Sequence, residues 1–231
     1  ITNFKDYELR DVLFVEGIIF VVGGVLSSIG GNPMGLSMQG LGQNNAQYIA
    51  NANLEVSKME KDKTSKVVLT ALMMCLIILA TMLIKVPIPF TQGYVNLGDA
   101  MIFLSVLILG WKYGIVAAGV GSMLGDIIGG AAAWAPWTLV IKGGMALIMG
   151  VCLKRGDSKL KEVIGMILAG AFMVAGYYVA EGVMYGNWVA AAIGIPWNIG
   201  QFTVGMVIAE ILSAALQKTP AGRYFTYKKS L

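Results

Sequence analysis

The run from Tyr94 to Gly150, YVNLGDAMIFLSVLILGWKYGIVAAGVGSMLGDIIGGAAAWAPWTLVIKGGMALIMG, decides how the rest of the chain is interpreted. It is mostly apolar, yet it contains Asn96, Asp99, Asp126 and Lys142. A charge at bilayer depth costs about 2.5–3.5 kcal/mol on insertion scales, so such residues usually face the protein interior or a cavity. The run therefore predicts a membrane bundle with a polar interior. That interior is either a small-molecule pocket or a packed core with a structural Asp126–Lys142 ion pair.

Small residues recur at a spacing of four within this run, at Ala117, Gly121, Gly125 and Gly129. On a helix this spacing places them on one face, where another backbone can approach closely. The run therefore predicts close helix–helix packing around the polar residues.

The composition is that of an integral membrane protein. Of 231 residues, 57% are hydrophobic and 13% are charged, whereas soluble domains carry about 25% charged residues. The net charge is +4, but the basic residues lie in short loops between apolar runs. The charge therefore does not indicate nucleic-acid binding. The chain has no His, and no phosphate-binding GxxxxGK[ST] loop occurs. We therefore expect no metal site, no cofactor and no ATP hydrolysis by this chain itself.

A spanning helix needs about 20 apolar residues. The expected helices are Val12–Gly30, Val67–Ile84, Ala100–Trp111, Gly114–Trp134, Pro136–Leu153, Val163–Tyr185 and Trp188–Leu216. The predicted fold class is thus an all-α integral membrane protein, with a six-helix bundle plus one additional N-terminal hydrophobic helix. Residues 1–61 are expected to form that helix and a polar linker, as an appended module, and residues 62–231 the six-helix membrane domain.

The distribution of Lys and Arg predicts the orientation of this domain. If the residues before Val67 are cytoplasmic, nearly all of its basic residues lie in cytoplasmic segments, and the outer loops hold only Lys85. This satisfies the positive-inside rule. The chain is therefore expected in the cell membrane, crossing it several times.

Polar and aromatic residues of several segments are expected at one depth, the outer half of the bundle. At about 1.5 Å per residue, the expected helix Gly114–Trp134 places Asp126 about 12 Å below Trp134. Convergence of a few polar groups with aromatic walls is typical of a small-ligand pocket. The candidate substrate-binding residues are Asn96, Asp99, Asp126, Trp134, Trp137, Lys142, Tyr178, Glu181 and Asn198.

Simpler interpretations of these residues stay open. Trp134 and Trp137 fit an aromatic belt at the membrane surface, and Glu181 fits a position facing external water. Tyr177 and Tyr178 are adjacent and point to different helix faces, so at most one of them is expected to line a pocket.

Two further stripes of small residues lie outside the opening run. Ala71 and Cys75 share a face of the first bundle helix, and Gly205, Ala209 and Ser213 share a face of the last. We predict that the first stripe is a partner interface. For the second, a partner contact and tight packing within the chain are equally open.

Several motifs between Lys66 and Leu216 resemble those of a known family. They are the Ala71 stripe, the IPIPFTQGYVNLGDA loop, the YGIVAAGVGSMLGDIIGG helix, the WAPWTLVIKG turn and the IPWN start of the last helix. Together they resemble the substrate-binding S components of energy-coupling-factor (ECF) vitamin transporters. The YVNLGDA and AP-x-T-x-x-IKG patterns are most similar to the branch that handles hydroxymethylpyrimidine and pyridoxine-type compounds.

The resemblance implies a high-affinity binding subunit for a small vitamin, with an outward pocket lidded by the Pro87–Gly98 loop. It implies a transmembrane coupling partner that carries two ATPase subunits. In this family the first helix offers an Ala-x-x-x-Ala face to that partner, and here Cys75 takes the second position. Residues 1–61 fall outside the resemblance. They are similar to small membrane proteins of Gram-positive bacteria, which suggests a Gram-positive source.

Two other functions are alternatives to a binding subunit. A stand-alone secondary transporter could use buried carboxylates to couple protons, but no inverted repeat is evident. A membrane-embedded enzyme could use Asp126 and Glu181 as an acid–base pair, although the chain has no His to assist. Copurification separates the alternatives, because only an S component should bring ATPase subunits with it.

Overall fold

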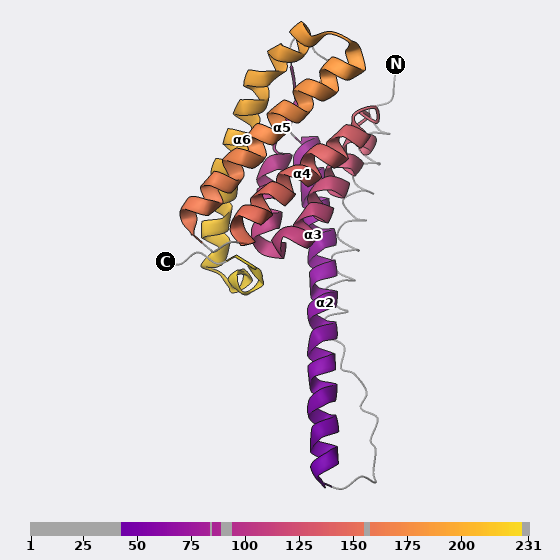
Figure 1. Ribbon diagram of the computed structural model, residues 1–231, viewed down its shortest axis with the longest axis vertical. Coiled ribbons are helices and arrows are strands. Elements are labelled where there is room, and N and C mark those ends of the chain that lie inside the picture. The colour runs from indigo at the N-terminus through magenta and orange to yellow at the C-terminus, as the bar shows by residue number, and fades with distance from the viewer. Residues whose placement is uncertain (1–42, 84, 89–93, 155–157, 228–231) are drawn as a thin grey trace, which may run out of the picture. The chain divides into compact units, whose positions relative to one another are not determined.

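The computed structural model describes residues 43–83, 85–88, 94–154 and 158–227 (Figure 1). The predicted helix Val12–Gly30 lies outside the described residues. The chain divides into two compact units, Ile1–Val68 and Leu69–Leu231. All features discussed below, apart from the start of α2, belong to the second unit.

The described secondary structure is almost entirely helical. Its elements are α2 (Gln43–Leu83), β1 (Lys85–Pro87), β2 (Tyr94–Asn96), α3 (Gly98–Ile128), α4 (Ala135–Lys154), α5 (Lys159–Tyr185), α6 (Trp188–Gln217) and the 3-10 helix η1 (Pro220–Tyr224). Among the described residues, five helices are long and apolar enough to cross a membrane. The predicted class, an all-α integral membrane protein, is confirmed.

Helix α2 begins much earlier than predicted. Apolarity placed its start at Val67, but the helix starts at Gln43 and includes residues expected in a polar linker. Those residues include Ala, Leu, Glu, Lys and Met, which favour helix whatever their polarity. Hydropathy detects the part of a helix that suits a bilayer, and it does not detect where the helix ends.

Helix α3 contains two helical segments joined at Gly110, where φ is 76° and ψ is 175°. The two segments correspond to the predicted helices Ala100–Trp111 and Gly114–Trp134. They fold back on each other, because a Cβ added to Gly114 would lie 3.1 Å from the Val106 Cα. With this kink the described residues of the unit contain six α-helical segments, as predicted for the bundle.

Helix α2 packs closely against the small residues of α3. A Cβ added to Gly121 would lie 3.2 Å from the Met74 Cα, and one added to Gly125 would lie 3.7 Å from the Ile78 Cα. The predicted role of this stripe in close backbone packing is confirmed.

The remaining helices close a ring of neighbours. Helix α4 packs against α3 and α5, and α6 packs against α5 and α3 (Figure 1). The core between them includes Phe103, Leu107, Met145, Met149 and Met173, each at most 2% exposed. Methionine is unbranched and fills irregular space between helices.

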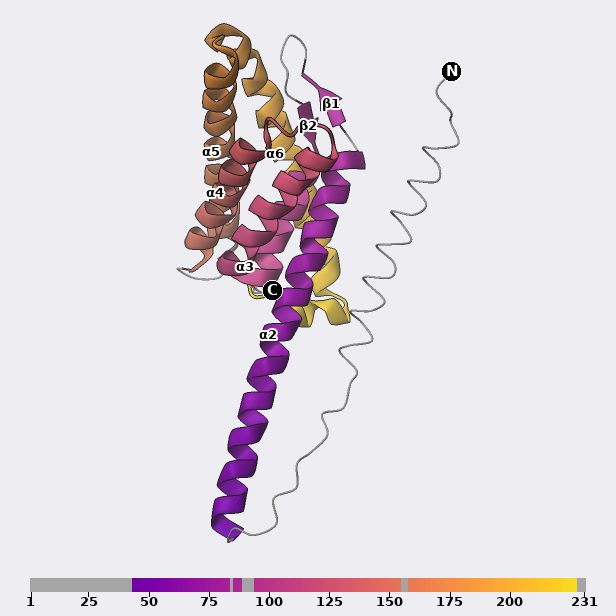
Figure 2. The same cartoon turned by 90° about the vertical axis from the view of Figure 1, so that its right-hand side faces the viewer.

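A short hairpin that was not predicted joins α2 to α3. Strands β1 and β2 pair antiparallel, with Lys85 opposite Asn96 and Pro87 opposite Tyr94. Figure 2 shows the hairpin at the end of this unit opposite η1. Strand β2 and the last residue of β1 lie in the segment Pro87–Gly98, which was expected to lid a pocket.

Candidate ligand-binding pocket

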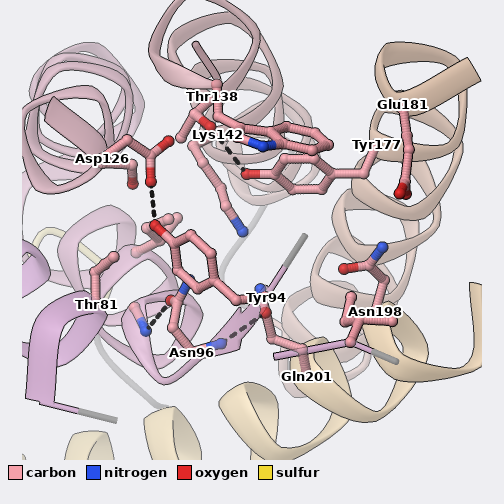
Figure 3. Close-up of a pocket in the computed structure, with 15 residues that line it drawn as sticks. Thr81, Tyr94, Asn96, Asp126, Thr138, Lys142, Tyr177, Glu181, Asn198 and Gln201 are labelled. Atoms are coloured by element: carbon pink, nitrogen blue, oxygen red, sulfur yellow. Dashed lines mark hydrogen bonds between the residues drawn. The ribbon is translucent and has the colours of Figure 1, made fainter. Parts of the chain in front are cut away.

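A pocket lies where the hairpin meets the bundle (Figure 3). Every long helix from α2 to α6 contributes to its lining, as do the residues around β2. The lining residues are Thr81, Ile88, Tyr94, Asn96, Gly98, Ile102, Ser122, Asp126, Trp134, Thr138, Lys142, Tyr177, Glu181, Asn198 and Gln201.

The pocket is narrow in this structure. Its empty space totals about 560 Å³ including the opening to solvent, but the centre of a water molecule can occupy only about 30 Å³. Pockets for small ligands usually measure about 300–1,000 Å³. A ring-shaped ligand therefore requires lining side chains to move outward.

Lys142 pairs with Asp99, and this corrects the expected Asp126–Lys142 pair. The Lys142 side chain is 3% exposed and that of Asp99 is not exposed at all. The Gln201 Nε2 donates to Asp99 Oδ2 at 2.8 Å, so both carboxylate oxygens are satisfied. The reason is the fold of α3, whose first segment brings Asp99 against α6: a Cβ added to Gly205 would lie 2.9 Å from the Asp99 Cβ.

Gln201 also connects this ion pair to the hairpin. The backbone N–H of Asn96 donates to Gln201 Oε1 at 2.8 Å. Since a backbone N–H can only donate, Gln201 must present its oxygen to β2 and its amide nitrogen to Asp99. One buried side chain on α6 thus ties the strand to the charged pair behind the pocket.

Asp126 accepts a hydrogen bond from the hydroxyl of Tyr94 through Oδ1 (Figure 3). Burial raises the pKa of the Tyr94 hydroxyl far above its usual value, and the neighbouring Asp126 raises that pKa further. The hydroxyl therefore keeps its proton and remains a donor. The Lys85 ammonium lies 4.7 Å from the centre of the Tyr94 ring, which holds the ring against the pocket.

The helix expected at Gly114–Trp134, from which the depth of Asp126 was estimated, ends earlier than predicted. Helix α3 ends at Ile128, two residues after Asp126, and Gly130 has φ of 81°. Trp134 therefore lies in the turn before α4 instead of in the same helix. It reaches the pocket from that turn and is 8% exposed.

An aromatic wall forms beside the polar residues. The ring centres of Trp134 and Tyr177 are 6.0 Å apart, and the Lys142 ammonium lies 5.2 Å from the centre of the Tyr177 ring. The hydroxyls of Tyr177 and Thr138 are 3.3 Å apart. This wall offers an apolar face with polar atoms at its edge.

Glu181 and Asn198 face each other from α5 and α6. A Cβ added to Gly194 would lie 3.4 Å from Glu181 Oε2 and 3.7 Å from Asn198 Nδ2. Both side chains are buried, at 5% and 7% exposure, and Figure 3 shows both on one side of the pocket. Burial excludes the alternative in which Glu181 faces external water.

Most of the nine candidate residues come together here. Asn96, Asp126, Trp134, Lys142, Glu181 and Asn198 line one pocket. Three candidates do not line it: Asp99 lies behind Lys142, Trp137 is partly buried against the core, and Tyr178 packs on Trp188 with ring centres 5.5 Å apart.

Tyr177 lines the pocket where Tyr178 was expected. Tyr177 precedes Glu181 by four residues and follows the buried Met173 by four, so it lies close to their helix face. The same spacing could have revealed Ser122, four before Asp126, and Thr138, four before Lys142. No such spacing predicts that Thr81, Ile88 or Tyr94 line the pocket, because these residues precede the first segment of α3.

The two stripes of small residues have different surroundings. Ala71 is exposed and Cys75 is partly exposed on α2, so both remain accessible on this unit. Gly205, Ala209 and Ser213 are buried within the chain. The stripe on α6 therefore serves internal packing.

Known proteins resemble this chain over the same region. The family model of the ECF-type riboflavin transporter S component matches residues 61–218. An uncharacterised protein of Pyrococcus woesei is 40% identical over 139 residues, which cover 60% of this chain and 92% of the relative. The thiamine precursor transporter HmpT of Lactococcus lactis subsp. cremoris is 28% identical over 162 residues, covering 70% and 93% respectively.

A solved structure shows the same fold. The crystal structure of the S component for biotin from an ECF-type ABC transporter aligns with a TM-score of 0.59 and 18% identity, over 71% of this chain and 97% of that one.

Fold, pocket and comparisons define a membrane-embedded substrate-binding subunit. The chain belongs to the family of S components of ECF-type transporters, as the motifs indicated. Membership implies that the chain associates with an energy-coupling module and binds a small-molecule substrate.

Proposed function

We propose that this S component binds a small heteroaromatic vitamin or vitamin precursor, of the hydroxymethylpyrimidine or pyridoxine type, with high affinity for uptake. The relative HmpT, named as a thiamine precursor transporter, supports this choice. The family model is named for riboflavin and the solved structure for biotin. Because these names differ, the residues of this pocket must decide between the ligands.

The observation that carries the proposal is the aromatic wall of Trp134 and Tyr177 beside buried polar groups. A flat ring can stack on such a wall, and this adds about 0.5–1.5 kcal/mol beyond area burial. Asn96, Asp126, Glu181 and Asn198 then bond the ring substituents. Lys142, held by Asp99, presents its ammonium at the same pocket.

Native mass spectrometry of the purified full chain tests the proposal, because a tightly bound vitamin travels with the protein. Titrations with hydroxymethylpyrimidine, pyridoxine, riboflavin and biotin then rank the ligands. We expect one of the first two to bind at least tenfold more tightly than the others. Tighter binding of riboflavin or biotin would reject the proposed ligand class.

Tryptophan fluorescence reports on the proposed stacking. Ligand should quench the fluorescence of the parent chain, and Trp134→Phe should abolish most of that quenching. Trp137→Phe is the matched control, because Trp137 does not line the pocket. Equal quenching in both variants would place the ligand away from Trp134.

The partners belong to the same proposal. We infer that a transmembrane coupling protein with two ATPase subunits supplies the energy, and that this chain is neither an enzyme nor a stand-alone carrier. Family membership supports both inferences. Copurification tests the first inference, because an S component should bring ATPase subunits with it. A secondary carrier would be purified alone and would transport its solute without them.

Residues 1–61 are proposed to form a module separate from the binding domain, because the family match begins at residue 61. A chain that starts at residue 62 should then bind ligand as the full chain does. A Gram-positive source is also proposed on the Lactococcus relative, although the more identical relative comes from Pyrococcus.

A further inference from the structure

Two polar atoms in the pocket stand out because they are buried without a hydrogen-bond partner. Among the described residues, Ser122 Oγ and Asp126 Oδ2 are in this state, and both residues line the pocket. Their residues are 3% and 4% exposed. A buried polar group that lacks a partner is costly, so such groups usually have a partner in the working protein.

The unpartnered oxygen of Asp126 differs from its partnered one. Oδ1 is occupied by the Tyr94 hydroxyl. Figure 3 shows the other oxygen directed away from Tyr94, on the side of Thr138 and Lys142. That side is the interior of the pocket, so this oxygen can reach a ligand bound there.

Ser122 and Asp126 are four residues apart on α3, so their side chains share a helix face with Cβ atoms about 5–6 Å apart. A serine within a helix often satisfies its hydroxyl on the carbonyl four residues earlier. Ser122 makes no such bond. Its hydroxyl is therefore available to the same ligand as the carboxylate.

The surrounding charges select the kind of ligand. The lining includes two carboxylates, Asp126 and Glu181, and one ammonium, that of Lys142. Asp99 already pairs with that ammonium. A ligand carboxylate or phosphate would meet an excess of negative charge here, whereas an N–H donor would not.

We propose that Ser122 and Asp126 form a subsite for an amino group on the ligand ring, together with the adjacent ring nitrogen. Asp126 Oδ2 accepts an N–H of the amino group, and the Ser122 hydroxyl donates to the ring nitrogen. The subsite rests on the proposed function and narrows it: the ligand is an aminopyrimidine, and the amino group determines specificity.

The test compares two ligands that differ in one group. Binding to the full chain is measured for hydroxymethylpyrimidine with its ring amino group, and for the analogue with hydrogen in its place. The parent chain should prefer the amino compound at least tenfold, which corresponds to about 1.4 kcal/mol. In Asp126→Asn and in Ser122→Ala this preference should fall to within about threefold.

Ser105→Ala is the matched control on the same helix. Ser105 is buried like Ser122, but its hydroxyl donates to the Ile102 carbonyl at 2.7 Å, and it does not line the pocket. It should leave the preference unchanged and lower the thermal stability of the ligand-free chain. Ser122→Ala should do the opposite, with reduced preference and undiminished stability, because it removes an unsatisfied hydroxyl.

The outcomes separate the two proposals. If the parent binds both pyrimidines within twofold, or if both pocket variants weaken both ligands by the same factor, the subsite is rejected and the proposed function stands. If the folded parent binds neither pyrimidines nor pyridoxine, the proposed function fails and the subsite fails with it. Since Ser122→Ala should fold even where Asp126→Asn does not, one informative variant remains in every case.

Discussion

Lys142 is a buried lysine of α4 whose ammonium has partners on two other helices. Its ammonium pairs with Asp99 and contacts the Met173 sulfur at 3.0 Å. Removing one member of a buried ion pair costs about 3–5 kcal/mol, because the other charge stays buried without compensation. The pair therefore holds α3 and α4 together beneath the pocket.

Lys142→Met should consequently destabilise the ligand-free chain by about 3–5 kcal/mol, whereas Asp99→Asn combined with Lys142→Met should recover much of that loss. Thermal unfolding in detergent measures both. Lys112→Met is the control, because the Lys112 side chain is exposed and exposed substitutions usually change stability by no more than about 0.5 kcal/mol. Strictly additive effects of Asp99→Asn and Lys142→Met would show that these two residues are not coupled.

Individual side-chain partners could not be predicted from the sequence. Hydropathy and the positive-inside rule predict Asp126 and Lys142 at a similar depth, so an Asp126–Lys142 pair was one of the two open interpretations. The partner that Lys142 finds depends on which segment of α3 faces α4 and α6. That arrangement follows from the reversal at Gly110, and a linear pattern of polar residues does not contain it.

Among the elements, α4, α5 and α6 were predicted within a few residues, because each is a single apolar run with clear ends. Helix α6, predicted at Trp188–Leu216, ends at Gln217. The hairpin was missed, since strands of three residues leave almost no periodic signal. Its residues nevertheless supply Tyr94 and Asn96 to the pocket.

The kink in α3 depends on one glycine. With φ of 76° and ψ of 175°, Gly110 occupies a backbone region that is essentially restricted to glycine. Gly110→Ala should destabilise the chain by about 1–3 kcal/mol. An added Cβ would also lie 3.2 Å from Thr226 Cγ2, so the contact between the kink and the C-terminal segment would be disturbed.

Gly200→Ala is the control for this prediction. Gly200 lies within α6, and a Cβ there meets no atom within 4 Å. Alanine favours helix over glycine by about 0.5–1 kcal/mol, so this variant should unfold at the same temperature as the parent or higher. If both glycine variants shifted the unfolding temperature alike, the kink would not require glycine at position 110.

At the scale of the whole molecule, the orientation in the membrane remains a prediction from the distribution of basic residues. After replacement of Cys75 and Cys152 by serine, a cysteine at Val86 in β1 should react with an impermeant thiol reagent from outside intact cells. A cysteine at Ser158, before α5, should react only after the membrane is opened. Both positions are exposed, so accessibility does not differ between them. The reverse labelling pattern would show that the pocket faces the cytoplasm, which would contradict the predicted orientation.

The surface proposed to meet the coupling partner includes Ala71 and Cys75 on α2, and substitutions at these two residues test it. The opposite face of this part of α2 is buried, with Ile77 and Thr81 at 0% and 3% exposure. Thr81 lines the pocket, and at about 1.5 Å per residue it lies about 15 Å along the helix from Ala71. A bulky side chain at Ala71 should therefore block close approach of a partner helix and leave ligand affinity within twofold.

We expect Ala71→Trp to reduce both copurified ATPase subunits and vitamin uptake at least tenfold, and Cys75→Trp to act in the same way. Val140→Trp on α4 is the control, since Val140 is 66% exposed and lies on another helix of the bundle. It should leave both measurements close to those of the parent. If Ala71→Trp abolished ligand binding while the coupling subunits still copurified, the stripe would act on the pocket and the partner would dock on another face.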